Sequence, residues 1–168
     1  MTRPPTQATV LDPTVLSNFA QVDHVELLLD LPRPVTVDVV RDELDAGAET
    51  HPYIENVLTV LGEWLPVITP SGQAETLEAQ FLDTLDPGEA QVLAVAEAAE
   101  GTVGTDDGDA RTAATKRGLD LTGSIGLLVR SVEDGHISAQ TADEYLKRWI
   151  EEAGFRSPAR GFEVFLEE

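Results

Sequence analysis

The stretch TDDGDAR at residues 105–111 places Asp106, Asp107 and Asp109 within four positions. Two unit charges about 4 Å apart repel each other by roughly 4 kcal/mol at an effective dielectric constant near 20. A carboxylate cluster of this kind therefore either faces open solvent or holds a cation. The chain has no cysteine and three scattered histidines, so oxygen ligands are the abundant ones, and they suit a hard cation such as Mg²⁺.

The charge balance makes acidic residues common throughout the chain. Of 168 residues, 31 are acidic and 11 are basic, which gives a formal net charge of −20. A content of 42% hydrophobic residues argues against disorder and allows one real core. We interpret the charge as an adaptation to a high-salt cytoplasm, since the Debye length is near 3 Å at about 1 M salt and dispersed carboxylates then hardly repel each other. An acidic residue is then a solvated surface residue by default, and only its position argues for chemistry.

The length and the apolar pattern predict one soluble domain. We expect this domain to span residues 1–168, with a loose N-terminus at 1–6 and a C-terminal turn and short helix at 155–168. No stretch approaches 18 uninterrupted apolar residues, and the first ten residues lack the apolar segment of a secretory signal. These features predict a cytoplasmic protein that does not enter a membrane.

Strand patterns alternate with helix patterns along the chain, and no hairpin signal separates two strands. We therefore expect an α/β protein, a three-layer α/β/α sandwich around a central, mainly parallel sheet of four or five strands. The first expected extended segment ends at Asp12, and the second opens the stretch 35–50. Three more lie within 65–72, 101–105 and 119–123. Helices are expected at 13–21, within 24–34, and in the later part of 35–50 up to a C-cap at Gly47. The stretch 51–64 is amphipathic, and 74–99 holds two helices separated near 85–90. Further helices are expected at 110–118, 124–135 and 138–154.

The candidate acids occupy particular places in this pattern. In parallel sheets, ligands bind at the carboxyl ends of the strands, and Asp12 and Asp107 both fall at expected strand exits. Each acid also has an ordinary structural role. Asp12 is placed to cap a helix, and Glu43 borders an apolar helix face. Glu89 lies three residues after Asp86, which is the spacing of a capping box. What these separate roles do not explain is the order of all the acids together.

Five segments carry that order: LDPTVLSNF (11–19), VVRDEL (39–44), LDPGEAQVLAVA (85–96), TDDGDARTAATKRGL (105–119) and LTGSIGLL (121–128). Together they resemble the PIN-domain family, and most closely its prokaryotic group with D-x-G-E-A, D-D-x-x-A-R and T-G-x-x-G-L-L-like motifs. The resemblance extends from about residue 8 to residue 155.

The resemblance implies a ribonuclease that depends on Mg²⁺ or Mn²⁺ and is related to toxins of the VapC type. It also implies an RNA substrate, an antitoxin partner and a homodimer. The catalytic acids would be Asp12, Glu43, Glu89 and Asp107, with Asp12, Glu89 and Asp107 holding the metal and Glu43 orienting the attacking water. The supporting residues would be Thr14, Asn18, Asp106 and Asp109, and the substrate would meet Arg111, Lys116, Arg117, Thr122 and Ser124.

Several alternatives stay open. Arg111, Lys116 and Arg117 fit a local RNA-binding patch and plain surface charges at a helix C-terminus about equally well. The chain as a whole also fits a catalytically silent PIN-like module that binds RNA or a protein, or an acidic α/β interaction domain whose carboxylates are only caps and surface residues. The C-terminal aromatic residues are expected in the core, and any left exposed would supply a dimer or partner surface: Trp149, Phe155, Phe162 and Phe165.

Overall fold

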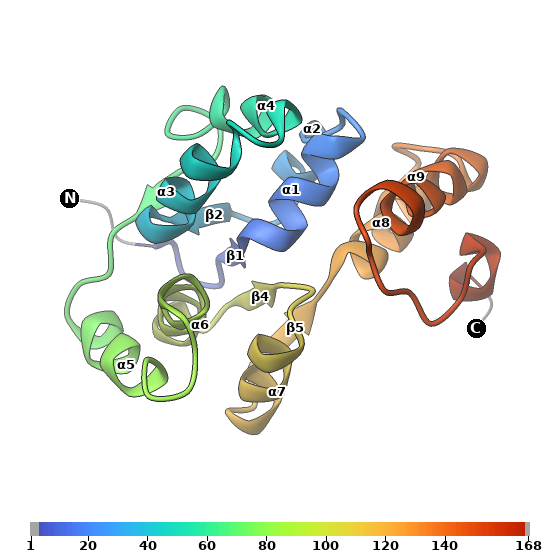
Figure 1. Cartoon of the computed structure of the whole chain (residues 1–168). Helices are drawn as coiled ribbons and strands as arrows, with labels where there is room; N and C mark the ends of the chain where they lie inside the picture. Colours follow the sequence, from blue (N-terminus) through green and yellow to red (C-terminus); the bar gives the residue numbers. More distant parts are fainter. Residues whose placement is uncertain (1–3, 167–168) are drawn as a thin grey trace.

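A central sheet of five parallel strands organises the chain in the computed structural model, which describes residues 4–166 (Figure 1). The strands are β1 (Thr9–Leu11), β2 (Pro34–Val37), β3 (Val67–Ile68), β4 (Thr102–Gly104) and β5 (Asp120–Thr122). Their order in the sheet is β3-β2-β1-β4-β5, and every pairing is parallel. The expected α/β class and the parallel sheet are confirmed, with five strands.

Helices cover both faces of the sheet, which makes the three layers that the sequence predicts. In Figure 1, the helices that follow β1 and β2 lie above the sheet, and those that lead into β4 and β5 lie below it. The upper helices are α1 (Pro13–Gln21), α2 (Glu26–Leu29), α3 (Asp38–Gly47) and α4 (Glu55–Leu58), and the lower ones are α5 (Gln73–Phe81), α6 (Pro87–Ala99) and α7 (Gly108–Lys116). The chain then adds α8 (Ser124–Glu133) and α9 (Ala139–Glu152) beside α1, with short 3₁₀ helices η1 (Pro52–Ile54) and η2 (Phe162–Leu166).

Helix α6 is the most deeply buried helix segment of the fold. Residues 90–96 are all buried, and the helix contacts β1, β2 and β4. A helix that is apolar on all sides belongs in an interior, and its alanines allow a close approach to the strands. Because α6 runs antiparallel to the strand that follows it, its N-terminus lies at the carboxyl edge of the sheet.

The strand order reverses between β1 and β4. From β1 the chain moves outward to β2, whereas from β4 it moves in the other direction to β5. Leu11 and Gly104 are paired in register, and the Asp12 backbone N–H donates to the Gly104 carbonyl at 3.0 Å. The residues that follow both strands therefore emerge side by side, at the position where open α/β sheets bind ligands.

One local expectation was wrong. Gly47 is the last residue of α3 and no left-handed cap, since Ala48 follows it in a right-handed conformation. The missing side chain instead makes room for Ile54, whose Cδ1 would lie 3.1 Å from a Cβ added at Gly47. The stretch 51–64 forms the two short helices η1 and α4, because Pro52 fixes a new start and the chain turns at Gly62, where φ is +87°.

The chain ends fall partly outside the described residues. Of the expected loose N-terminus, only residues 4–6 lie within the described range, and of the expected C-terminal turn and helix, residues 155–166. That part of the tail is a loop followed by η2. Across residues 4–166, every helix is too short or too polar to cross a membrane.

Candidate active site

Asp12 lies at the N-terminus of α1 and is 1% exposed. One of its carboxyl oxygens accepts hydrogen bonds from the Thr14 hydroxyl at 2.8 Å and from the Val15 backbone N–H at 3.1 Å. The other oxygen accepts from the Thr105 hydroxyl. Burial raises the pKa of Asp12 to about 7, because its hydrogen bonds offset only part of the lost hydration and Asp106 repels its charge. Asp12 is thus a helix cap, as predicted, and also a carboxyl group held in one orientation.

Thr105 connects the end of β4 to two of the acids. Its side chain is buried, and its hydroxyl donates to Asp12 while accepting from the Asp107 backbone N–H at 3.0 Å. Nothing in the sequence singles out Thr105, because a neutral hydroxyl residue carries no signal of its own. The available signal was its position between an expected strand and the aspartates.

Glu89 and Asp107 form a carboxyl pair between the N-termini of α6 and α7. A hydrogen bond with the neighbouring Asp107 side chain favours the protonated form of Glu89. Burial, followed by this hydrogen bond, raises the pKa of Glu89 to about 8. Asp107 also caps α7 by accepting from the Ala110 N–H at 2.9 Å. Two acids from separate segments therefore meet here, in a pair that keeps a proton near neutral pH.

Glu43 reaches the same end of α6 from helix α3. A Cβ added at Gly88 would overlap the Glu43 carboxyl group, so Glu43 lies directly over this glycine. Glu43 is an exposed residue overall, yet partial burial of its carboxyl group raises its pKa, and the charge of Asp86 adds to the shift. Asp86 and Glu89 form the capping box that their spacing predicts, with bonds of 2.9 and 3.3 Å. In this motif the aspartate caps, the glycine makes room for Glu43, and the glutamate faces Asp107.

Asp106, which follows the end of β4, binds polar side chains from α1 and α8. It accepts hydrogen bonds from the Asn18 amide at 3.2 Å, from the Ser124 N–H at 2.8 Å and from the Ser124 hydroxyl at 2.5 Å. Its own backbone N–H donates to the Thr14 hydroxyl at 3.0 Å. The structure therefore brings Thr14, Asn18 and Ser124 to the acidic site, at the junction of α1, α8 and the end of β4.

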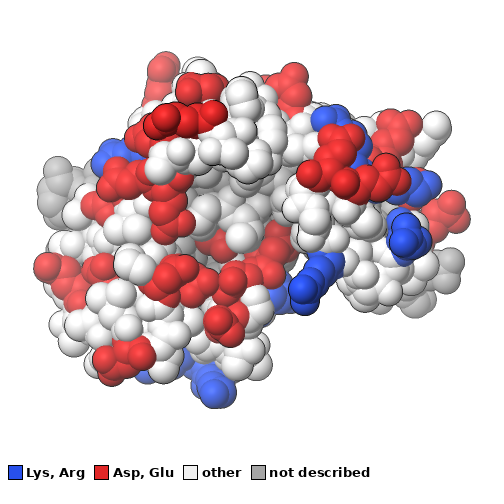
Figure 2. Space-filling view, viewed as in Figure 1, with Lys and Arg blue, Asp and Glu red and all other residues white. Residues whose placement is uncertain are grey.

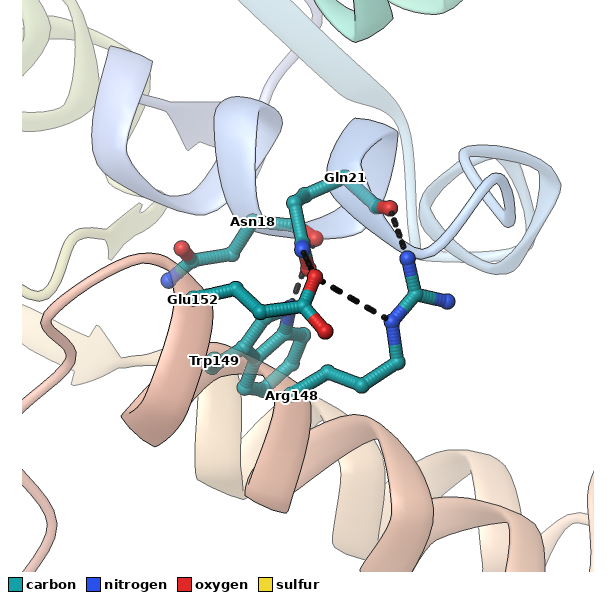
Figure 3. Close-up of polar contacts among 5 residues, drawn as sticks. All are labelled: Asn18, Gln21, Arg148, Trp149 and Glu152. Carbon is teal, nitrogen blue, oxygen red and sulfur yellow. Dashed lines mark hydrogen bonds and ion pairs between the residues drawn. The ribbon is translucent and has the colours of Figure 1, made fainter.

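Helix α9 fixes the α1 backbone behind this junction (Figure 3). The Trp149 indole donates to the Asn18 carbonyl at 2.7 Å, and the Arg148 guanidinium donates to the Gln21 carbonyl at 2.9 Å. The Gln21 amide donates in turn to Glu152 at 2.6 Å. Because Asn18 reaches Asp106 with its side chain, α9 stabilises one wall of the site without contributing an acid.

The expected substrate residues divide into two groups. Arg111 donates to the Thr105 carbonyl at 2.9 Å, and Thr122 ends β5 beside it, so both lie next to the acids. Asp109 is exposed in the first turn of α7. Lys116 ends α7 and Arg117 follows it, one helix length away from the acids.

Arg117 is engaged in a separate contact. Its guanidinium pairs with Glu97 at 2.5 Å and lies over the Phe81 ring, with 5.2 Å to the centroid. This arrangement fastens α7 to α6 and α5, and it favours the surface-charge interpretation for Arg117. Arg111 is the member of the expected basic group that the fold places at the site.

The chemistry of the donor set fits a hard cation, although the expected ligands are not gathered at one point. Within residues 4–166, no three histidine, aspartate or glutamate side chains lie so that they could hold a metal ion together. Asp12 is linked to Asp107 through Thr105, and its oxygens already accept three hydrogen bonds. The Glu89–Asp107 pair offers two hard oxygen donors and a proton that a cation can displace.

Comparison with known families gives a match over most of the chain. A family model described as a PIN domain, DUF3368, matches residues 8–168. The comparison with curated proteins and the comparison with solved structures gave no match.

Proposed function

The chain belongs to the PIN-domain family, and on this premise we propose that it is a ribonuclease that hydrolyses RNA phosphodiester bonds with Mg²⁺ or Mn²⁺ at its acidic site. The family has a nuclease-type fold, generally depends on divalent metals and commonly acts on RNA. The observation that carries the proposal is that Asp12 and Asp107 follow neighbouring strands where the strand order reverses and are linked by Thr105, with Glu89 beside Asp107. Three helix N-termini meet there, and their partial positive charges favour anionic groups.

In this proposal Glu89 and Asp107 hold the cation, and Asp12 is aligned beside them through Thr105. The bound cation would acidify a water molecule and stabilise the attacking and leaving oxygens. Glu43 orients the attacking water and accepts its proton, a role that its raised pKa favours. Asp106 with Asn18 and Ser124 forms the wall against which the substrate lies.

We extend the proposal to the toxin of a toxin–antitoxin pair, because PIN domains often pair with antitoxins. This extension adds an antitoxin protein and a homodimer as partners. It also places the protein in the cytoplasm at high salt, where a net charge of −20 is tolerable.

One observation favours a second candidate function. Because no three acids in residues 4–166 lie so that they could hold a metal ion together, a catalytically silent PIN-like module that binds RNA or a protein fits the same fold. Such a module would keep its acids as helix caps. Turnover separates the two candidates.

The test is cleavage of a labelled single-stranded RNA by the purified chain in high salt, with Mn²⁺ or with EDTA. Asp12→Asn should lower the cleavage rate by about 1,000-fold or more, since several kcal/mol of transition-state stabilisation depend on this acid. Asp45→Asn, at an exposed position of α3, is the matched control and should cleave like the wild type. Undiminished cleavage by Asp12→Asn would refute the assignment, and Mn²⁺ binding without any turnover by the wild type would support the silent module.

A further inference from the structure

A cavity of about 380 Å³ lies at the amino ends of the strands, at the edge of the sheet opposite the acidic site. It is lined by Thr9, Thr102 and Asp120, which are the first residues of β1, β4 and β5. The four acids proposed for catalysis are not among the residues that line it. Because an extended chain rises about 3.3 Å per residue, Thr9 lies about 10 Å from Asp12. The cavity is therefore a site separate from the acids.

The floor of the cavity is a polar row on the face of the sheet. Thr9 pairs in register with Thr102, and Thr102 pairs with Asp120, so the three side chains stand side by side on one face. Strands of a parallel sheet are usually covered on both faces and apolar throughout. The Thr9 hydroxyl donates to the Pro32 carbonyl at 2.8 Å and can still accept a hydrogen bond. The row thus offers two hydroxyl groups and a carboxylate to a ligand.

Three exposed residues that line the cavity have a left-handed backbone. They are Gln7 (φ +62°), Arg33 (φ +45°) and Glu100 (φ +53°), and each lies one or two residues before a strand. Within residues 4–166, Asp23 is the only other non-glycine residue with such a backbone. Glycine adopts this conformation without strain, whereas a residue with a Cβ rarely does. Long polar side chains therefore occupy three positions where glycine would be less strained, which is typical of a functional site.

The charges along the cavity are balanced, unlike those of the whole chain. Arg33 and Arg130 line it together with two acids, whereas the chain has 11 basic and 31 acidic residues. Carboxylates are spread widely over the face that Figure 2 shows, and basic side chains are few there. Arg33 forms no ion pair with any residue from 4 to 166, and Arg130 makes one exposed contact, at 3.6 Å from Asp134. Two guanidinium groups are thus placed to meet an anionic group.

We propose that this cavity binds a pentose phosphate group, with Arg33 and Arg130 contacting the phosphate and Asp120 accepting hydrogen bonds from the sugar hydroxyls. Guanidinium groups match phosphate oxygens in charge and geometry. A carboxylate beside two hydroxyl groups suits a sugar, whereas it repels a bare anion. The volume is at the lower end of the range for small-molecule sites, which suits a pentose phosphate or a nucleoside monophosphate. The site does not depend on the proposed ribonuclease function, because it shares no acid with it.

Titration calorimetry of the purified chain in EDTA tests this site without a metal at the acids. The ligands are ribose 5-phosphate, adenosine monophosphate, adenosine and inorganic phosphate. The first two should bind about tenfold more tightly than the last two, because only they combine sugar hydroxyls with a phosphate. Equal affinities of the first two would identify the pentose phosphate as the whole ligand, and tighter binding of adenosine monophosphate would identify a nucleotide. Dissociation constants above about 1 mM for both would overturn the proposal.

Arg33→Gly separates the role of the side chain from that of the backbone. It removes a phosphate contact, so the affinity for ribose 5-phosphate should fall about tenfold or more. It also relieves the left-handed strain, so Tm should rise by about 2 °C. Asp23→Gly is the matched control, because Asp23 has a φ of +55°, is exposed and lies outside the cavity. The control should raise Tm in the same way and keep the wild-type affinity, whereas wild-type affinity in Arg33→Gly would overturn the site.

Asp120→Ala distinguishes a sugar phosphate site from a patch that attracts any anion. The substitution removes the acceptor for the sugar hydroxyls, so the affinity for ribose 5-phosphate should fall about tenfold. The affinity for inorganic phosphate should stay the same or increase, because a negative charge is lost. Asp120 is exposed on an edge strand, so the core keeps its packing. Undiminished affinity for ribose 5-phosphate in this variant would mean that only charge attracts the ligand, and the proposal would be wrong.

Discussion

The acidic site has two halves, at the N-terminus of α1 and at the facing N-termini of α6 and α7. Asp12, in the first half, is 1% exposed and accepts hydrogen bonds from two hydroxyl groups and a backbone N–H. Glu89 and Asp107, in the second half, are only half-buried and hydrogen-bond to each other. Both halves contain a carboxyl group with a raised pKa.

The difference lies in what compensates the charge. Around Asp12, neutral donors surround a buried carboxyl group, so its orientation is fixed and its charge is costly. In the Glu89–Asp107 pair, both acids are half-buried, and the neighbouring Asp107 favours the protonated form of Glu89. We infer that the first half sets geometry and that the second half is where a cation replaces a proton.

The largest expected effect concerns the pH dependence of stability. Because the pKa values of Asp12 and Glu89 are raised in the folded state, to about 7 and about 8, their contribution to stability is full at low pH and is lost as pH rises through these values. In EDTA, the free energy of unfolding should therefore fall between about pH 5 and pH 8. Asp12→Asn cannot ionise and can still hydrogen-bond to the same neighbours, so its stability relative to the wild type should increase over this range, by on the order of a few kcal/mol.

Chemical denaturation at several pH values measures this difference. The comparison between the two proteins cancels the repulsion among the many surface acids, which both share. A constant difference in the free energy of unfolding from about pH 5 to pH 8 would mean that burial does not disfavour the ionised form of Asp12. The contrast drawn between the two halves of the site would then be wrong. Addition of Mn²⁺ to the wild type at about pH 8 should restore stability, because the cation binds only the folded site.

The next prediction concerns the half of the site that contains Glu89 and Asp107. Glu89→Gln keeps a hydrogen bond to Asp107 but removes one hard oxygen ligand and the shared proton. It should weaken Mn²⁺ binding about 100-fold, and Mn²⁺ binding at about pH 7 should release a proton from the wild type but not from this variant. Titration calorimetry in buffers of different ionisation enthalpy counts the protons. Glu63→Gln, at an exposed loop position, should leave both quantities unchanged. Equal proton release from Glu89→Gln and the wild type would place the displaced proton elsewhere.

Sequence patterns predict the helix caps of both halves of the site. Asp12, Asp86 and Asp107 each cap the helix that follows directly along the chain, so their roles depend on local spacing alone. The ends of the strands are also predicted from the local sequence, because each strand is followed by a charged residue or a turn signal. The order of the acids along the chain then indicates that they belong to one site.

The remaining features depend on how distant segments pack. The shared proton of Glu89 and Asp107 follows from the contact between α6 and α7, which no spacing in the sequence specifies. Thr105 carries no charge, and its role appears only when β1 and β4 lie in register. The pairing of Arg117 with Glu97 depends on the same α6–α7 contact, which is why its basic charge alone left two interpretations open.

A smaller effect tests whether Thr105 couples the two halves. Thr105→Val removes the donor to Asp12 and the acceptor for the Asp107 N–H while keeping the shape of the side chain. It should reduce cleavage about tenfold and lower stability by about 1–3 kcal/mol, since a buried N–H loses its partner. The acidic limb of the pH–rate profile should move to higher pH, because a hydrogen bond that lowers the pKa of Asp12 is gone. Thr105→Ser should restore the profile, and Thr115→Val, at an exposed hydroxyl on α7, should not change it.

The smallest effect separates Glu43 from the rest of the site. Gly88→Ala adds a methyl group where the Glu43 carboxyl group lies, so Glu43 has to move while Asp86 and Asp107 keep capping their helices. Gly108→Ala is the matched control, since Gly108 also lies in the first turn of a helix and a Cβ there would meet nothing within 4 Å. Both substitutions favour the helix by up to about 1 kcal/mol. Gly88→Ala should therefore lower the catalytic rate several-fold at an unchanged KM for RNA, without loss of thermal stability, whereas Gly108→Ala should keep the wild-type rate. Equal rates for the two variants would leave Glu43 a surface residue and confine the chemistry to the two halves that Thr105 joins.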